Sequence, residues 1–387
     1  MKDSLIGYFK RNKHALMLFG VFILTVISFM TMENKQRGWM GSDHRPEGLF
    51  MHIVFAILFI FAVAIKNKQY KKIVVGIYIA NFVFVALIAI QQYYGILGTG
   101  NAKYCPEWAK GLYNYYSKIK IRAGHFYLGE TGTFYNLNHM GYYTAMGSML
   151  CTAVFLKSKN ILSNIFSALL CILSYWTIVV NNTFGAFLAI GATLIIFAFL
   201  LWIKSGYKKI KPFVPVAIFV AVCIGVSLIP YKDSKNLVIK NFVTLSEDTK
   251  NIAEGDDKAE DAGSGRWPVW VTTVDMIKEK PLLGYGPNGV DAEYTKRKAS
   301  VSRAHCEILE RAVSTGIPSA ILYAGAIAYI IIKGIRRKNL LTDPGYTLAP
   351  LMAVVAYSIS GLVGVFLFYT ASHYLILMGL MSETEDE

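Results

Sequence analysis

Apolar windows long enough to cross a lipid bilayer recur along most of this 387-residue chain. A hydrocarbon core of about 30 Å takes roughly 20 apolar residues in a helix, and helices satisfy their own backbone groups where lipid offers no partners. The windows lie at residues 14–32, 49–65, 72–94, 139–157, 161–180, 185–203, 212–230 and 306–332. Together with a hydrophobic content of 54%, they predict an all-α, polytopic membrane protein.

A ninth apolar stretch, 346–380, is too long for one crossing. As a single straight helix it would span about 50 Å, at about 1.5 Å per residue. Ser360, Gly361 and Gly364 supply a break between two shorter helices. The sequence therefore predicts about ten transmembrane helices.

Lysines and arginines at alternate connections predict the orientation, because short basic loops stay on the cytoplasmic side. These clusters are Lys2, Lys10, Arg11 and Lys13; Lys66, Lys68, Lys71 and Lys72; Lys157 and Lys159; Lys204, Lys208, Lys209 and Lys211; and Lys333, Arg336, Arg337 and Lys338. We expect a multi-pass protein of the bacterial cytoplasmic (inner) membrane with both termini in the cytoplasm.

This orientation divides the chain into three parts. Residues 1–230 hold the first seven transmembrane helices, including an outer loop at 95–138. A large extracytoplasmic loop with short helices covers 231–304, and 305–387 hold the last three helices and an acidic cytoplasmic tail. The large loop is mostly polar, so we expect the chemistry there.

The net charge of +14 does not predict a nucleic-acid partner. Its clusters flank the apolar windows and lack interleaved aromatic residues, which is typical of faces against anionic lipid. The sequence has no CxxC, HExxH or carboxylate cluster. We therefore expect neither a metal nor a cofactor.

The apolar windows contain no Asp, Glu, Lys or Arg at their centres. Ion-coupled transporters and pumps usually keep ionisable groups near the bilayer midplane. This pattern favours an enzyme acting at the outer leaflet. His52 and His373 lie in or near the windows, where we interpret them as packed, hydrogen-bonded side chains.

The sequence GSGRWPVWVTTVDMIKEK in the large loop predicts a helix capped by Ser264, with Pro268 in its first turn. Arg266 would then stand at a helix N-terminus, where a guanidinium and free backbone amides together suit a phosphate. An ion pair with a loop carboxylate such as Asp261 is the alternative for Arg266.

PLLGYGPNGV, at 281–290, predicts a tight turn. His305 is then expected to begin a short amphipathic helix that ends at Gly316, with Pro318 in the first turn of the next membrane helix. A histidine with an ordinary pKa of about 6.5 could take a proton from a hydroxyl. A cap or surface role is the alternative for His305.

Several segments together resemble the O-antigen ligase and polymerase superfamily of bacterial envelope glycosyltransferases, which are of the GT-C type. They are GTFYNLNHMGYY at 132–143, SGRWPVW at 264–270, PLLGYG at 281–286, the HX10G spacing from His305 to Gly316, and the closing APLMAVVAYSISGLVGVFLFY with LMGL. Their order and spacing carry the resemblance.

The resemblance implies a metal-independent transferase that takes a glycan from an undecaprenyl diphosphate carrier and passes it to an acceptor hydroxyl. Arg266 would bind the diphosphate and His305 would activate or position the acceptor. The chemistry suits these residue types, because a diphosphate leaving group needs fixed positive charge and a hydroxyl needs a base. The partners would be the lipid-linked donor, a glycan or lipid acceptor and membrane lipids.

Two positions depart from the pattern. Phe184 stands in NNTFGAFLAI where many relatives carry an arginine, so Arg122 or Arg303 is expected to bind the diphosphate beside Arg266. Cys306 stands where Asn is common. Two further residues near these segments, Glu307 and Asn138, are expected to support the site.

Within the superfamily we favour a polymerase of polysaccharide repeat units, because the chain is short for a ligase and rich in Lys and Asn. A ligase that moves finished polymer to a lipid or protein acceptor is the alternative. A transporter of lipid-linked sugar would instead need a continuous polar pathway through the membrane helices, and a scaffold would not need His305.

Overall fold

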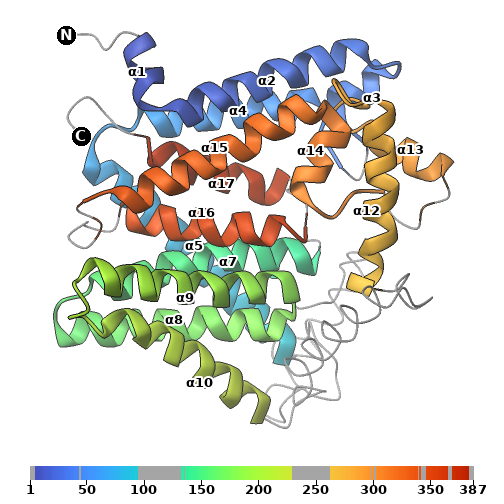
Figure 1. The fold of residues 1–387 in the computed structure, drawn as a ribbon. Helices are drawn as coiled ribbons and strands as arrows, with labels where there is room; N and C mark the ends of the chain where they lie inside the picture. Colours follow the sequence, from blue (N-terminus) through green and yellow to red (C-terminus); the bar gives the residue numbers. More distant parts are fainter. Residues whose placement is uncertain are drawn as a thin grey trace. The chain divides into compact units, whose positions relative to one another are not determined.

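The computed structural model of the chain describes residues 5–42, 45–94, 132–134, 136–228, 262–297, 299, 302–338, 340, 346–364 and 368–382. Within these residues the regular elements are helices (Figure 1). The expected all-α, polytopic membrane fold is confirmed. The chain forms two compact units, each built from segments distant in sequence.

The first unit contains residues 1–67, 244–337 and 361–387. Its helices are α1 (Leu5–Arg11), α2 (Lys13–Thr31), α3 (Lys35–Met40), α4 (Leu49–Ala64), α12 (Ala262–Glu279), α13 (Val290–Lys296), α14 (Glu307–Thr315), α15 (Ile317–Arg336) and α17 (Phe368–Leu380). Helix α15 packs along α2, and α17 packs along α4. This unit holds both His305 and Arg266.

The second unit contains residues 68–243 and 338–360. Its helices are α5 (Lys68–Tyr94), α7 (Leu137–Lys157), α8 (Ile161–Asn181), α9 (Phe184–Lys204), the 3₁₀ helix η3 (Lys211–Phe213), α10 (Val214–Leu228) and α16 (Leu348–Gly361). Helix α8 packs against α5, α7 and α10, and α7 is buried along nearly its whole length.

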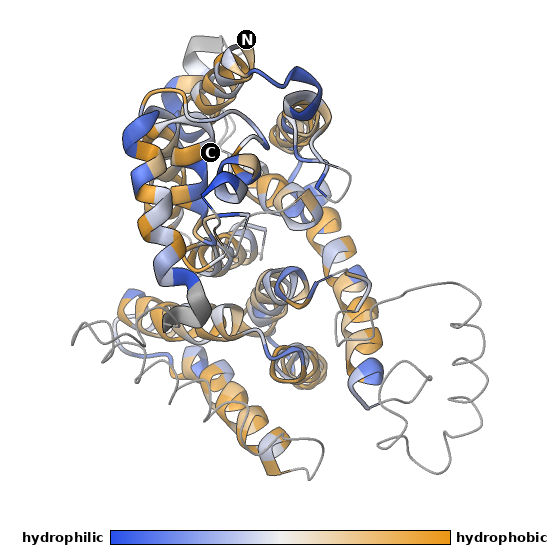
Figure 2. Cartoon of the chain, turned by 90° about the vertical axis from the view of Figure 1, so that its right-hand side faces the viewer, coloured by the Kyte–Doolittle hydropathy of each residue, from blue (hydrophilic) through white to orange (hydrophobic). Residues whose placement is uncertain are grey.

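Each of the ten predicted membrane segments contains a helix in the part of the chain that the structure describes. Six of these are long and apolar enough to cross a membrane: Lys13–Thr31, Lys68–Tyr94, Ile161–Asn181, Phe184–Lys204, Lys211–Leu228 and Ile317–Arg336. Leu49–Ala64 and Leu348–Gly361 are shorter apolar helices. Hydrophobic residues dominate the long helices (Figure 2), although ten crossings stay a prediction.

The window predicted at 306–332 is divided in the structure. Its first part forms the short amphipathic helix α14, and the membrane helix α15 begins only at Ile317. Gly316, with φ +92°, separates the two helices, and Pro318 lies in the first turn of α15. Residues 346–380 likewise form α16 and α17, with the break where the sequence placed it.

Small residues allow close helix contacts in the first unit. A Cβ placed on Gly379 of α17 would lie 2.6 Å from the Cβ of Ala62 and 2.9 Å from the carbonyl oxygen of Phe59, both on α4. Membrane helices associate through such close packing, because lipid provides no hydrophobic drive between them. Close packing of small residues therefore stabilises the contact between α4 and α17.

The turn predicted at 281–290 is present up to Gly289 and connects α12 to α13, which begins at Val290. It lies against the end of α14: the N–H groups of Tyr285 and Gly286 donate to the carbonyls of Val313 and Ser314 at 3.0 and 2.7 Å. Ser28 of α2 donates to the carbonyl of Leu283 at 2.5 Å. These bonds tie the polar elements α12, α13 and α14 to the end of α2.

Candidate functional site

His305 lies in a loop immediately before α14 and not in the helix itself. The helix begins at Glu307 with Cys306 as its N-cap, so the expectation that His305 starts the helix was wrong. The physical reason is its backbone, which has φ +48° and lies in the left-handed region that ends any right-handed helix. Non-glycine residues in this region cost about 1–3 kcal/mol and cluster at functional sites.

Glu310 fixes this loop from the first turn of α14. Its carboxylate accepts a hydrogen bond from the Ala304 N–H at 2.9 Å, and its own N–H donates to the Cys306 carbonyl at 2.8 Å. Ala304 is fully buried. The residues on both sides of His305 are thus bonded to a single helical residue.

We therefore expect Glu310→Ala to lower the rate of glycan transfer by about tenfold to 100-fold, since small misplacements of a reacting group have effects of this size. Glu310→Gln keeps an oxygen for the Ala304 N–H and should stay near the wild-type rate. Initial rates in membranes with matched amounts of each variant test this. Wild-type rates for Glu310→Ala would mean that the loop holds its shape without the carboxylate.

The positive charges of three arginines act on His305. Burial, followed by the charges of Arg266, Arg303 and Arg45, lowers its pKa to about 4. The structure thus brings Arg266, Arg303 and His305 together in one unit and adds Arg45, which the sequence analysis missed. At neutral pH the imidazole is uncharged and can accept a proton.

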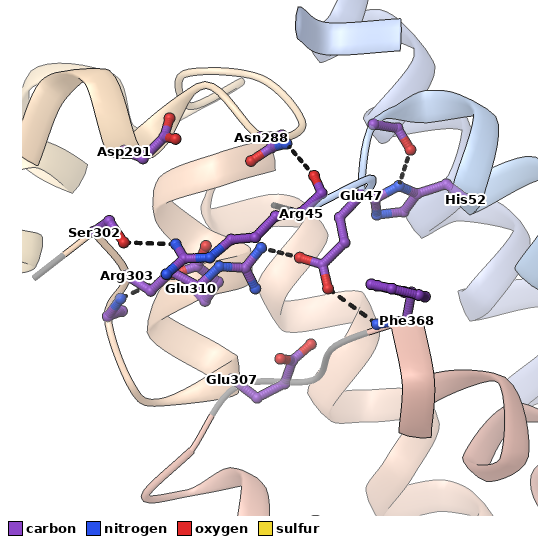
Figure 3. Close-up of polar contacts among 12 residues, drawn as sticks. Arg45, Glu47, His52, Asn288, Asp291, Ser302, Arg303, Glu307, Glu310 and Phe368 are labelled. Atoms are coloured by element: carbon purple, nitrogen blue, oxygen red, sulfur yellow. Dashed lines mark hydrogen bonds and ion pairs between the residues drawn. The ribbon is translucent and has the colours of Figure 1, made fainter. Parts of the chain in front are cut away.

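Arg303 is buried and forms an ion pair with Glu47, which precedes α4 (Figure 3). The same carboxylate accepts the Phe368 N–H at 2.9 Å, at the start of α17. Glu47 therefore uses one oxygen for the arginine and the other for a helix N-terminus, where negative charge is favourable. Arg303 already has an anionic partner in this arrangement.

Glu307, expected as a supporting residue, is buried and pairs with Arg311 one helical turn later at 3.2 Å. Arg311 also lies 3.3 Å from Nε2 of His52. The other ring nitrogen of His52 lies 3.0 Å from the Gly48 carbonyl, so Nδ1 donates there and Nε2 accepts from Arg311. His52 is a packed, hydrogen-bonded side chain, as the sequence suggested.

Helix α12 begins at Ala262, two residues before the expected cap, so Ser264 lies within the helix and Pro268 beyond its first turn. Arg266 stands in the second turn, and the expectation of a guanidinium directly at the helix N-terminus was wrong. Small residues at 262–265 offer no steric reason to stop the helix at Ser264. Arg266 is half-buried and reaches His305 through its charge.

The remaining candidates lie elsewhere. Asn138 belongs to α7 in the second unit, where its backbone N–H donates to the Asn136 side chain at 2.8 Å. Arg122 lies outside the described residues. Among described residues, no group of three or more His, Cys, Asp and Glu side chains could hold a metal ion.

A cavity of about 620 Å³ lies beside the His305 loop in the first unit. Most of its wall is apolar and comes from α2, α4 and α17, with side chains such as Leu18, Phe22, Phe55 and Phe59. The polar part of the wall includes Glu47, His52, Asn288, Arg303, Glu307, Glu310 and Arg311. An apolar space thus leads to the charged residues that flank His305.

Comparison with known proteins gives one family. The family described as O-antigen ligase matches residues 168–324, which include Arg266, Arg303, His305 and Gly316. No curated protein matches the chain. Over residues 168–324 the chain is therefore similar to the O-antigen ligase family, which supports the resemblance found in the sequence.

Proposed function

We propose that the chain transfers a glycan from an undecaprenyl diphosphate carrier to an acceptor hydroxyl at the outer face of the membrane, and that it polymerises polysaccharide repeat units. The observation that carries the proposal is the loop that Glu310 fixes around His305, where the charges of Arg266, Arg303 and Arg45 help to lower the histidine's pKa. Arg303 pairs with Glu47, and the Arg45 guanidinium donates to the neutral hydroxyl of Ser302. The group therefore favours an anionic ligand next to a base.

In the proposed reaction, the oxygen of the acceptor hydroxyl bonds to the anomeric carbon of the donor sugar, and His305 accepts the proton of that hydroxyl. The bond from that carbon to the diphosphate oxygen breaks, and the electron pair leaves with the diphosphate. Arg266 stabilises the charge that develops there, as fixed positive groups do in a preorganised site. Arginines in this position provide the charge that a divalent metal provides in other transferases.

The cavity supports a lipid-linked substrate. Its apolar wall follows α2 from Ala15 to Thr25, which is about 15 Å at about 1.5 Å per residue. An isoprenoid chain buried there would leave its head group at the charged end, beside Arg303 and Glu307. A soluble sugar nucleotide has no apolar chain that could pack against this wall.

The proposal is tested by the length of glycans on the carrier in a host that lacks the protein. We expect single repeat units to accumulate there, and the wild-type protein to restore long chains. Arg266→Ala should fail to restore them at matched expression. Lys278→Ala removes one positive charge three turns further along the same helix, where Lys278 pairs with exposed Asp275, and should restore them.

Two results would contradict the proposal. If Arg266→Ala restored long chains, Arg266 would have no part in donor binding. If long chains formed on the carrier without the protein but failed to reach their acceptor, the protein would be a ligase and not a polymerase.

A further inference from the structure

Three cations lie on the short connection between α2 and α4, and two of them have evident structural roles. Lys35 donates to the carbonyls of Phe29 and Met30 at 2.9 and 2.5 Å, at the end of α2. Arg37 pairs with Asp291 of α13. Arg45 makes no comparable ion pair with a carboxylate of the described residues.

The backbone of Arg45 is held in place on both sides. Its N–H donates to the Ser42 carbonyl at 2.8 Å, and its carbonyl accepts the Ser42 N–H at 2.9 Å. The Asn288 side chain donates to the same carbonyl at 2.8 Å. A Cβ on Gly41, which has φ +92°, would come within 2.3 Å of this oxygen. The turn is therefore closely packed, and the backbone from which the Arg45 side chain extends is held in one position.

The guanidinium of Arg45 ends beside the His305 loop. Its Nη1 donates to the Ser302 hydroxyl at 2.6 Å, and Figure 3 shows it next to Arg303. Its charge acts on both Arg303 and His305. Two guanidiniums thus lie together, and Glu47 pairs with one of them.

Glu310 and Glu307 also act on Arg303 with charge of the opposite sign, so carboxylates balance Arg303, whereas the Arg45 guanidinium donates to Ser302. Ser302 is neutral and uses one of the five N–H donors of Arg45. A phosphate group would supply both the opposite charge and two acceptors for the guanidinium fork. Arg303 is less available to a phosphate, because its side chain is buried and paired with Glu47.

We propose that Arg45 binds a phosphate of the ligand's diphosphate together with Arg266, whose charge also acts on His305. This inference rests on the proposed function and names a residue of its donor site from a segment more than 200 residues away in sequence. Arg45 takes the place that the sequence analysis gave to Arg303 or Arg122.

The test is direct binding to the purified full-length protein in detergent. The probes are undecaprenyl diphosphate, inorganic diphosphate and undecaprenol, which together separate head-group binding from chain binding. For Arg45→Ala, we expect the dissociation constants of both diphosphates to rise at least tenfold, with that of undecaprenol unchanged. Arg45→Lys keeps the charge but loses the fork, and should lie between Arg45→Ala and wild type.

Ser302→Ala and Lys278→Ala are the controls. Ser302→Ala removes the hydrogen bond at 2.6 Å but leaves the guanidinium, and Lys278→Ala removes one exposed charge. Both should bind the diphosphates like wild type. Wild-type affinity in Arg45→Ala would overturn the inference, and so would an equal loss in Ser302→Ala, which would show that Arg45 acts only by holding the loop.

Failure of the proposed function gives a different result. If the wild-type protein bound undecaprenyl diphosphate no better than undecaprenol, the diphosphate donor itself would be wrong. If undecaprenyl diphosphate bound well and inorganic diphosphate did not, with Arg45→Ala still weaker, the phosphate recognised by Arg45 would be that of a lipid head group.

Discussion

His305→Ala is expected to lower the rate of glycan transfer by about 100-fold or more, which is the usual contribution of a positioned general base. The imidazole lies among three arginines and is uncharged at neutral pH, so it can accept a proton from the acceptor hydroxyl. His305→Asn is the more informative variant, because Asn tolerates the left-handed backbone that His305 adopts, with φ +48°, but is not a base. Both variants should lose activity with the donor still bound.

The measurement is the initial rate of glycan transfer with purified protein in liposomes, beside the affinity for undecaprenyl diphosphate. Unchanged rates in His305→Asn would show that the imidazole is not the base. Loss of both rate and donor affinity would assign His305 to binding.

The pH dependence provides a second measure of the same residue. With a pKa of about 4 in the free protein, His305 stays uncharged down to acidic pH, so kcat/KM should fall only near pH 4 and not near 6.5. A bound diphosphate offsets the arginine charges that lower this pKa. The acid limb of kcat should therefore lie at higher pH than that of kcat/KM, and coinciding limbs would exclude such charge coupling.

Most of the fold could be predicted from the sequence, because a membrane helix is specified by one local property. Each of the ten apolar segments contains a helix, although the segment at 306–332 is divided into α14 and α15, and the break between α16 and α17 lies at the predicted glycines. The predicted starts of the helices in the polar segments, α12 and α14, were less accurate. At α12 the sequence offered Ser264 as a cap, but nothing in Ala262 or Gly263 prevents the helix from starting earlier.

The candidate site was predicted only in part. His305, Arg266, Arg303 and Glu307 lie in one unit, and their roles stay predictions. The sequence analysis did not single out Arg45, Glu47 or Glu310. Glu47 and Glu310 act through contacts that join distant or backbone atoms: Glu47 reaches Arg303 and Phe368, and Glu310 reaches the Ala304 N–H. No local pattern encodes such contacts.

A signal for Arg45 was present in the sequence. In the predicted topology the connection between the first two membrane helices faces outward, yet it carries Lys35, Arg37 and Arg45. Short outer connections are normally poor in Lys and Arg. Basic residues in such a connection therefore call for a specific partner. Arg37 pairs with Asp291, and for Arg45 the partner is the anionic ligand proposed above.

Gly316→Ala is expected to have the largest effect on stability of any single change considered for this chain. Gly316 ends α14 with φ +92°, and a Cβ there would lie 1.9 Å from the carbonyl oxygen of Leu282. The strained backbone costs about 1–3 kcal/mol, and forced overlap in a packed region adds about 1–3 kcal/mol. Since domains are stable by only about 5–15 kcal/mol, much of the protein should fail to fold.

The overlap cannot be relieved cheaply, because its partner is backbone. The Pro281 carbonyl accepts the Ile317 N–H at 2.8 Å, and the Tyr285 N–H donates to the Val313 carbonyl at 3.0 Å. The turn at 281–289 is therefore bonded both to the start of α15 and to the end of α14. Moving the turn would also break the bond from Ser28 to the Leu283 carbonyl. Gly76→Ala in α5 is the matched control, because a Cβ there meets nothing within 4 Å, and helix propensity favours it.

The measurement is the yield of monodisperse protein and its thermal midpoint in detergent, for wild type, Gly316→Ala and Gly76→Ala. Gly76→Ala should match wild type, and Gly316→Ala should give little folded protein. This result would explain the HX10G spacing physically: α14, Glu307–Thr315, connects the two positions, with a left-handed residue before it and another after it. An unchanged midpoint for Gly316→Ala would show instead that α14 can end against the turn without glycine, and that the spacing serves only the chemistry at His305.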